Sequence, residues 1–374
     1  MKILFFYPEN PLSKTQGNNV RAHNLLKYFK EKKYSVDFVS KEENISLISE
    51  SDLKDLKDQN LVNKTYFLKP LNKKKSILKK TFFNRKTKSN DVFSRVLHSE
   101  EVEFEKIVNS TKYDYIIISY AYYVKLIDKI NLNGAKTIID THDFLTSQHK
   151  ETKDFNLGQF FEDEIKVLRK FDFIWAISIE EQYLFTQFIN KPIILVPHCV
   201  SNKNYKPLEK QIDLLYVASG NTHNIKSIDW FFKEIYPELD KKIKITIVGK
   251  ICNYIDNYDN VKKIDYVENL DPYYLKAKVV ICPMLSGTGL KIKVVEALSF
   301  GLPVVCTPRG VDGLINKTEN GCLVANDAEE MIRHINNLLN DYSYYEKFQK
   351  EALNFFKNHL EFTNVKNKLD VFFK

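Results

Sequence analysis

Short, continuous apolar runs alternate with amphipathic stretches along the chain. The chain begins with such a run, KILFFY at 2–7, and a second, SVDFVS, follows at 35–40. Between them, residues 21–34 place apolar side chains at helical spacing. A short apolar run with polar flanks is typical of a strand that is buried on both faces, as in parallel sheets. The opening of the chain therefore predicts a β-loop-α-β unit.

The same alternation recurs twice, on either side of a polar stretch without periodicity. Further strands are predicted within 113–121, 135–143, 172–178, 192–198, 212–219, 244–250, 276–284 and 303–307, and further helices at 158–171, 180–189, 227–239, 290–300, 327–340, 342–360 and 363–374. We predict an α/β protein of two doubly wound domains, with residues 1–200 as the first, 201–211 as a linker, 212–360 as the second, and 361–374 as a helix crossing back to the first. Ligands of such sheets bind beyond the carboxyl ends of the strands, so two domains can face a central cleft.

One segment of the second domain, SGTGLKIKVVEALSFGLPVV at 286–305, combines glycines, lysines and a single acid. Gly287 and Gly289 allow a close approach of the backbone, and a helix start with Lys291 and Lys293 suits a phosphate. Glu296 follows one to two turns later, where a carboxylate suits neutral hydroxyls such as those of a ribose. A plain turn with surface lysines and an exposed glutamate stays the alternative.

In the first domain, polar residues follow two of the predicted strands. Gly17 and Asn18 precede the first helix, with Arg21 after them, and either cap that helix or meet a substrate. His142 stands between Asp140 and Asp143 at the end of a strand, which is more suggestive of function than a lone histidine.

Several chemistries lack their motifs in this sequence. There is no Asp-x-Asp triplet for a metal bridging a diphosphate, no Walker loop and no G-x-S-x-G. The first strand-to-helix turn is too long for a dinucleotide fingerprint and lacks G-x-G-x-x-G, which disfavours an NAD enzyme.

The formal net charge is +8, and part of the excess lies in residues 64–88, which hold ten Lys and Arg with no acid among them. Two interpretations stay open: a solvated, lysine-rich connection, or a surface whose interleaved aromatics contact anionic lipid headgroups. Nucleic acid is not expected, because no nucleic-acid motif accompanies the charge.

Cysteine usage and hydropathy bear on the compartment. The five cysteines are scattered, odd in number and without zinc spacing, which predicts a reduced, cytoplasmic protein. No run is long enough to span a bilayer, so any membrane contact is expected to be peripheral, at the inner face of the cell membrane.

Taken together, these motifs resemble a known family. The segments are DTHD at 140–143, AIS at 176–178 with Glu180 and Glu181, VPH at 196–198, YVENL at 266–270, residues 286–307 and GVDGL at 310–314. In this order they are similar to the GT-B glycosyltransferases of family four, the "group 1" enzymes. The resemblance covers nearly the whole chain and implies two Rossmann-like domains.

The resemblance implies transfer of a sugar from a UDP- or GDP-linked donor, with retention at the anomeric carbon and without a metal or other cofactor. The acceptor is expected to be a glycan or a lipid-linked acceptor in bacterial surface polysaccharide synthesis. Glu296 matches the acid that holds the donor ribose, whereas Thr288 stands where the family usually has a second glutamate.

The resemblance also assigns roles to the remaining residues. His142 and Lys291 are expected at the reacting centre; Gly287, Thr288, Gly289, Leu290, Lys293, Val267, Glu268 and Lys226 on the donor side; and Gly17, Asn18 and Arg21 on the acceptor side. The Arg and Lys with which the family commonly grips the diphosphate have no clear match at 219–226, so that role is expected of Lys291 and Lys293, with Lys226 as the second choice. Two alternatives stay open: a catalytically silent GT-B protein that binds a sugar nucleotide or a partner, and another GT-B chemistry, such as an inverting transferase or an epimerase.

Overall fold

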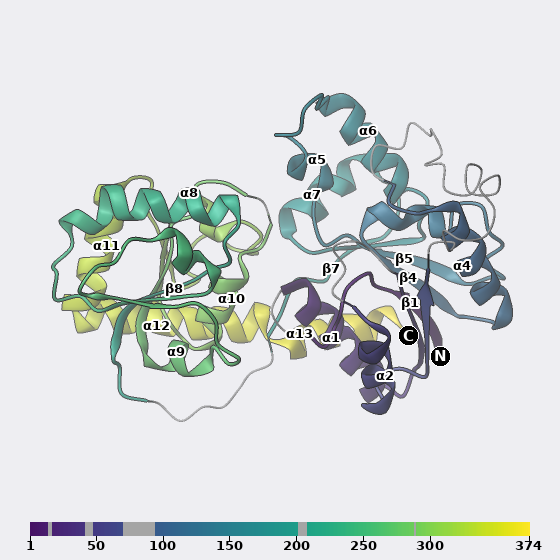
Figure 1. Cartoon of the computed structure of the whole chain (residues 1–374), viewed down its shortest axis with the longest axis horizontal. Helices are drawn as coiled ribbons and strands as arrows, with labels where there is room; N and C mark the ends of the chain where they lie inside the picture. Colours follow the sequence, from purple (N-terminus) through teal and green to yellow (C-terminus); the bar gives the residue numbers. More distant parts are fainter. Residues whose placement is uncertain (14–16, 42–47, 70–93, 201–207, 288) are drawn as a thin grey trace. The chain divides into compact units, whose positions relative to one another are not determined.

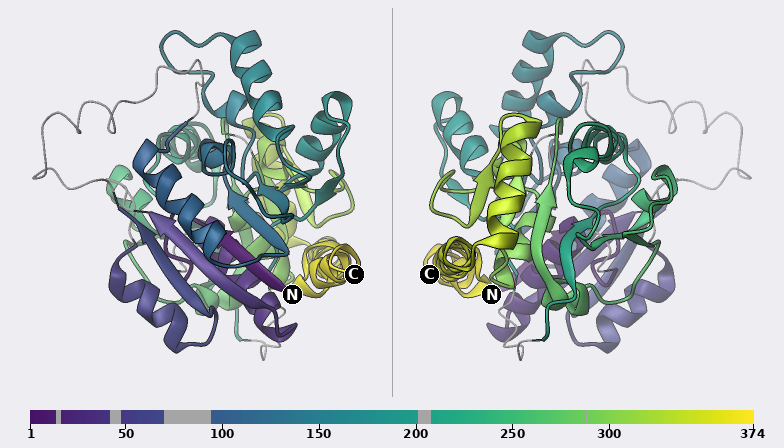
Figure 2. Two further views of the ribbon diagram at one scale, coloured as in Figure 1. Left: turned by 90° about the vertical axis from the view of Figure 1, so that its right-hand side faces the viewer. Right: turned by 90° about the vertical axis from the view of Figure 1, so that its left-hand side faces the viewer.

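The protein folds as two units, each built on a parallel β-sheet. The structure is a computed structural model that describes residues 1–13, 17–41, 48–69, 94–200, 208–287 and 289–374. The units are Met1–Val196 (unit 1) and Pro197–Lys374 (unit 2), and in each of them helices flank the sheet (Figures 1 and 2). The predicted α/β architecture with two doubly wound sheets is confirmed.

Unit 1 contains a seven-stranded parallel sheet in the order β3-β2-β1-β4-β5-β6-β7. Its strands are β1 (Lys2–Phe6), β2 (Ser35–Lys41), β3 (Lys64–Leu68), β4 (Tyr115–Ser119), β5 (Lys136–Asp140), β6 (Phe173–Ala176) and β7 (Ile193–Leu195). Its helices are α1 (Gly17–Glu31), α2 (Glu50–Asp58), α4 (His98–Ser110), η1 (Ala121–Leu126), α5 (Leu145–Gln148), α6 (Leu157–Leu168) and α7 (Ile179–Phe188). The strand order reverses direction between β1 and β4, and ligands of doubly wound sheets bind at that switch point.

Unit 2 contains a six-stranded parallel sheet in the order β10-β9-β8-β11-β12-β13. Its strands are β8 (Ile212–Val217), β9 (Ile245–Val248), β10 (Val261–Ile264), β11 (Ala277–Cys282), β12 (Val304–Cys306) and β13 (Cys322–Val324). Its longer helices are α8 (Thr222–Trp230), α10 (Ile292–Ser299), α11 (Ala328–Asn340), α12 (Tyr342–Phe355) and α13 (Phe362–Phe372), and its shorter ones are η2 (Phe231–Ile235), η3 (Tyr236–Glu238), η4 (Lys250–Tyr254), α9 (Asp271–Lys276), η5 (Pro308–Val311) and η6 (Phe356–Leu360). Here the switch point lies between β8 and β11.

The apolar runs form strands because both faces of each sheet are covered. Along β11, Val279 and Ile281 pack with α8 and α11, whereas Val280 and Cys282 pack with α10 and α12. Successive side chains of a strand point to opposite faces, so a strand between two helical layers needs apolar residues at every position. This is why the runs are continuous rather than alternating.

Some expectations need correction. Residues 64–68, placed in a lysine-rich connection, form the edge strand β3, which pairs with β2 in parallel. Lysines on an edge strand oppose pairing with other chains. Residues 70–93, most of the basic segment, lie outside the described residues, as does most of the predicted linker. The single helix expected at 227–239 is instead α8 followed by π-helical and 3₁₀ turns.

Two further observations concern the cysteines and the hydropathy of the helices. Cys199, Cys252, Cys282, Cys306 and Cys322 are all free and buried. In the part of the chain that the structure describes, no helix is both long and apolar enough to cross a membrane.

Candidate functional site

At the switch point of unit 1, three aromatic rings follow three neighbouring strands. Tyr7 comes directly after β1, Tyr120 after β4 and His142 two residues after β5. The rings of Tyr120 and His142 stack with centroids 4.2 Å apart, and Tyr7 stacks on Tyr120 at 6.4 Å. The carboxyl edge of the sheet therefore carries a stacked aromatic cluster with an imidazole in it.

Two of these residues have strained backbones. Tyr120 has φ of 66° and His142 has φ of 60°, both in the left-handed region. A residue other than glycine adopts this conformation at a cost of about 1–3 kcal/mol, and only where the surrounding structure holds it in place. Such residues are often found at functional sites. The strain is consistent with a site that depends on where the His142 ring lies.

The His142 ring lies against a buried ion pair. Its Nε2 is 3.1 Å from Asp140 Oδ2, and Arg21 Nε donates to both Asp140 oxygens at 3.1 Å. Burial alone would raise the pKa of Asp140, but Arg21 and His142 outweigh it and hold this pKa below its usual range. Among the described residues, His142 Nδ1 has no hydrogen-bond partner although it is buried.

The predicted acceptor-side residues lie at this same edge. Asn18 donates through Nδ2 to Glu9 Oε2 at 3.0 Å and to Tyr120 Oη at 2.8 Å, and Gly17 is the first residue of α1. Arg21 is buried and also donates to the Val196 carbonyl, so its visible role is to hold Asp140. Contact of these residues with an acceptor stays a prediction.

At the switch point of unit 2, a glycine-containing loop follows β11 and leads into α10. Gly287 and Gly289 have φ of 94° and 74°, which favours glycine at both positions; Thr288 lies outside the described residues. Ser286 Oγ is 2.8 Å from His223 Nδ1, in the first turn of α8. A Cβ on Gly287 would lie 3.5 Å from the His223 ring. The N-terminal ends of α8 and α10 therefore converge on this loop.

The two predicted lysines are held at the start of α10. Lys291 occupies the N-cap position, which no side-chain hydrogen bond caps, and its Nζ donates to the Gly289 carbonyl at 2.8 Å. Lys293 Nζ donates to Asn224 Oδ1 at 3.0 Å and lies 4.5 Å from the centre of the Tyr216 ring. Burial lowers the pKa of Lys293 to about 8. Cationic side chains and a helix N-terminus in one place form an anion-binding environment.

Glu296 lies on α10, half-buried, and accepts a hydrogen bond from Tyr274 Oη at 2.7 Å. The Tyr274 ring is buried and stacks on Phe300 at 5.2 Å. Burial, and then the Glu296 carboxylate, raise the pKa of Tyr274 well above its ordinary value, so the phenol remains a donor. The carboxylate is thus oriented by an aromatic partner from α9.

The other predicted donor residues border the same region less directly. Val267 and Leu290 are partly buried and pack against the core layer that contains α10. Lys226 and Glu268 are exposed. Their contact with a donor stays a prediction.

Sequence reasoning missed several of these residues because their partners are distant in the chain. Tyr7, Tyr120, His223, Asn224 and Tyr274 were not expected at a site. One usable signal existed for two of them, since Tyr7 and Tyr120 lie at the carboxyl ends of predicted strands.

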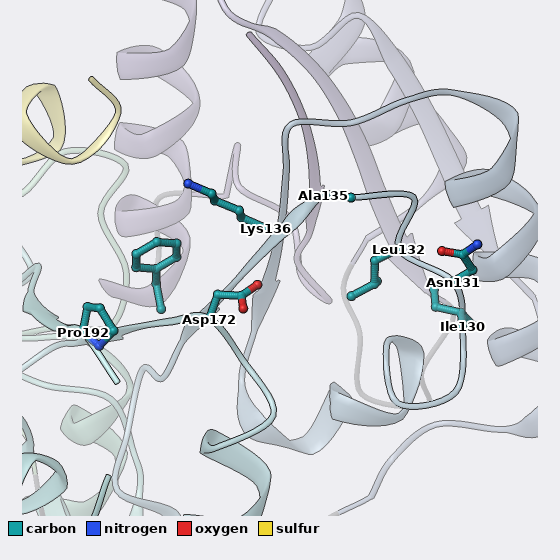
Figure 3. A pocket seen from close by; sticks show the side chains of 9 residues that line it. Ile130, Asn131, Leu132, Ala135, Lys136, Asp172 and Pro192 are labelled. Carbon is teal, nitrogen blue, oxygen red and sulfur yellow. The ribbon is translucent and has the colours of Figure 1, made fainter. Parts of the chain in front are cut away.

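A hollow of about 650 Å³ lies elsewhere, among residues that include Lys136, Asp172 and Pro192 (Figure 3). These residues precede or begin β5, β6 and β7, so the hollow is at the amino ends of the strands. Thr137 N and Oγ1 donate to Asp172, at 2.8 and 2.9 Å, which gives that acid a structural role. Within the described ranges, no cluster of His, Cys, Asp and Glu that could hold a metal is found.

Comparison with known proteins agrees with this arrangement. Residues 211–341 match the model of the family described as "Glycosyl transferases group 1". An uncharacterized glycosyltransferase of Haemophilus influenzae is 31% identical over 157 residues, which are 41% of this chain and 40% of that protein. An uncharacterized 44.6 kDa protein in the cps region of Klebsiella pneumoniae is 21% identical over 289 residues, covering 68% and 72% of the two chains.

Solved structures share the whole fold at low identity. Sucrose-phosphate synthase from Thermosynechococcus elongatus matches with a TM-score of 0.73, 15% identity and coverage of 100% and 98%. HepE of Anabaena, in complex with UDP-glucose, matches with a TM-score of 0.70, 13% identity and coverage of 100% and 99%. The chain therefore has the GT-B fold, and residues 211–341 match the group 1 glycosyltransferase model, as the sequence motifs predicted.

Proposed function

We propose that this chain is a glycosyltransferase that moves a sugar from a nucleotide-sugar donor to a glycan or lipid-linked acceptor. The observation that carries the proposal is the carboxyl edge of unit 2. There an oriented carboxylate, Glu296, follows a glycine-containing loop and two lysines on the first turns of one helix. Glu296 suits the ribose hydroxyls, and the loop, Lys291 and the end of α10 suit the diphosphate.

The chemistry requires little from the protein besides positioning and charge. The bond from the anomeric carbon to the diphosphate breaks, and a bond from the acceptor oxygen to that carbon forms. The acceptor proton passes to the departing diphosphate. Lys291, the backbone N–H groups of the loop and the α10 end stabilise the negative charge that develops on the leaving group. His223 Nδ1 lies 2.8 Å from Ser286 Oγ, and in the tautomer in which Nδ1 accepts from that hydroxyl, Nε2 carries the proton and is a further donor.

Retention and metal independence belong to the proposal. In the proposed mechanism, Lys291 and the N-terminal end of α10 stabilise the negative charge of the diphosphate, so no metal ion is required. Contact of His142 with the donor sugar, which the family resemblance implies, also belongs to the proposal, and the buried, partly unsatisfied imidazole is in keeping with such a role. A UDP-linked sugar is the first donor to test, since HepE was solved with UDP-glucose.

We also propose a place for the reaction in surface polysaccharide synthesis. The support is the Klebsiella relative, whose name puts it in a cps region. Peripheral contact with the inner face of the cell membrane, from residues 64–88, stays a prediction.

The test is a panel of UDP- and GDP-linked sugars incubated with the full chain, with release of nucleoside diphosphate as the readout. We expect turnover of at least one donor, unchanged by EDTA, and an anomeric NMR signal showing retention. A catalytically silent binder would give binding of a donor without release. Absence of both binding and release across the panel would overturn the proposal.

A further inference from the structure

Residues 141–146, called the His142 loop below, are held by two buried carboxyl groups from different helices. Glu164 of α6 accepts from Leu145 N and Thr146 N, both at 2.8 Å, and from Thr146 Oγ1 at 2.6 Å. These bonds engage both oxygens of the carboxyl group. The far end of the loop is therefore fixed to α6.

The near end of the loop is fixed to α7. Glu181 Oε2 is 3.1 Å from Thr141 Oγ1 and accepts from Ile177 N at 3.3 Å. Thr141 Oγ1 is also 3.1 Å from the Trp175 carbonyl. Its single hydroxyl proton cannot serve two acceptors at once, but a protonated Glu181 can donate to Thr141, which then donates to Trp175. The hydrogen-bond chain is complete when Glu181 is neutral.

Burying two carboxyl groups in this way is costly. Glu164 is 1% exposed and Glu181 is 5% exposed. Within the described part of the chain, neither has a Lys, Arg or His at ion-pair distance, so no opposite charge offsets the loss of hydration. Burial, and then the Asp143 charge, raise the pKa of Glu181 to about 8, in agreement with the neutral form.

His142 lies between these two anchors, in a left-handed conformation that is unfavourable for a side-chain-bearing residue. Such a conformation persists only where neighbouring groups determine it. We propose that Glu164 and Glu181 are positioning residues, whose buried carboxyl groups hold the His142 loop so that the imidazole stacks on Tyr120. The functional part of this inference rests on the proposed glycosyltransferase reaction, because His142 is expected to act there.

Two readouts separate the inference from the proposed function. The first needs no substrate: the imidazole signals of His142 in ¹H–¹³C spectra, identified by their loss in His142→Gln. The second is the kcat and KM for nucleotide release from UDP-glucose and the other sugars of the panel. The variants are Glu181→Ala, Glu164→Ala and Glu181→Gln. The controls are Glu180→Gln and Glu162→Gln, exposed neighbours on the same helices.

We expect both alanine variants to shift the His142 signals and to lower kcat by about 100-fold, the scale of a misplaced catalytic group, with a smaller change in KM. Glu181→Gln keeps a neutral group of the same shape, so its His142 signals and its kcat should match those of the wild type. The same is expected of both controls. Unchanged His142 signals in folded alanine variants would overturn the inference. If an alanine variant does not fold, Glu164→Gln and Glu181→Asp replace it, and unchanged signals in both would be equally decisive. Wild-type protein without turnover, but with shifted signals in the variants, would count against the proposed function alone.

Discussion

The carboxyl edges of the two sheets occupy equivalent places in two similar folds but differ in chemistry. In unit 1 the edge is aromatic and acidic: Tyr120 stacks on His142, Asp140 lies 3.1 Å from His142 Nε2, and Glu164 and Glu181 are buried. In unit 2 the edge is a loop with two positive-φ glycines next to Lys291 and Lys293.

This difference indicates a division of labour. At the edge of unit 1 the polar groups largely satisfy one another, which fixes the position of a single imidazole. At the edge of unit 2, two lysines and the uncapped N-terminus of α10 lie next to a loop with two positive-φ glycines. This arrangement suits an anionic ligand. In the proposed reaction, one edge supplies geometry and the other supplies charge stabilisation, although both arise at the switch point of a doubly wound sheet.

The strongest challenge to this comparison is Lys291→Ala. If the edge of unit 2 stabilises the leaving diphosphate, the substitution should lower kcat for nucleotide release by about 100- to 1,000-fold, as removal of a transition-state donor does elsewhere. Lys262→Ala, an exposed lysine on β10, is the matched control and should keep the wild-type rate. If Lys291→Ala and Lys262→Ala had equal rates, Lys291 would have no role in stabilising the leaving diphosphate.

The corresponding change in unit 1 is His142→Ala. We expect a loss of about 100-fold in kcat with little change in the binding of free nucleoside diphosphate, because this edge contributes position rather than charge to the donor. Steady-state kinetics, combined with calorimetric titration of UDP, checks both parts. If His142→Ala bound UDP more weakly than the wild type, the edge of unit 1 would also contribute to nucleotide binding, and this part of the comparison would be contradicted.

A smaller effect is expected from Glu296→Ala. Loss of the ribose contact should raise the donor KM or Kd by about 10-fold, equivalent to one or two hydrogen bonds, and leave kcat nearly unchanged. Tyr274→Phe, which removes only the hydroxyl that orients the carboxylate, should show a weaker effect in the same direction. If Glu296→Ala and Tyr274→Phe lowered kcat to the same extent, Glu296 would act in catalysis rather than in donor binding.

A last prediction concerns stability rather than activity, and tests the acidic character of unit 1. The pKa of Glu181 is raised by burial from about 4.5 to about 8, so between these values the folded chain keeps a proton that the unfolded chain releases. The contribution of Glu181 to stability is therefore largest at or below about pH 4.5 and falls as pH rises to 8. Urea unfolding at pH 5 to 8 should show Glu181→Gln gaining stability relative to wild type as pH rises. Parallel pH profiles would contradict this assignment.

Much of the fold was predictable because strands covered on both faces leave continuous apolar runs in the sequence. Strands β3 and β13 were both missed, and β3 was missed because KTYFL opens a lysine-rich stretch. Helix α10 starts two residues later than predicted, because a loop with positive-φ glycines precedes its first turn.

The site was predictable where it is contiguous in the sequence. Gly287, Lys291 and Glu296 lie within one segment, and a family motif runs through them. Tyr274 and His223 were not predictable, because their partners Glu296 and Ser286 are 22 and 63 positions away. Arg21 shows the same limit: only the folded chain reveals that it holds Asp140, 119 positions later.

The most direct test of the central claim, that the edge of unit 2 is a nucleoside diphosphate site, is calorimetric titration of UDP and GDP into four proteins. These are the wild type, Glu296→Ala, Lys291→Ala and Lys262→Ala. The account predicts that at least one nucleotide binds the wild type and Lys262→Ala equally, and binds the other two at least about 10-fold more weakly. Absence of binding to the wild type, or equal binding to all four proteins, would contradict it.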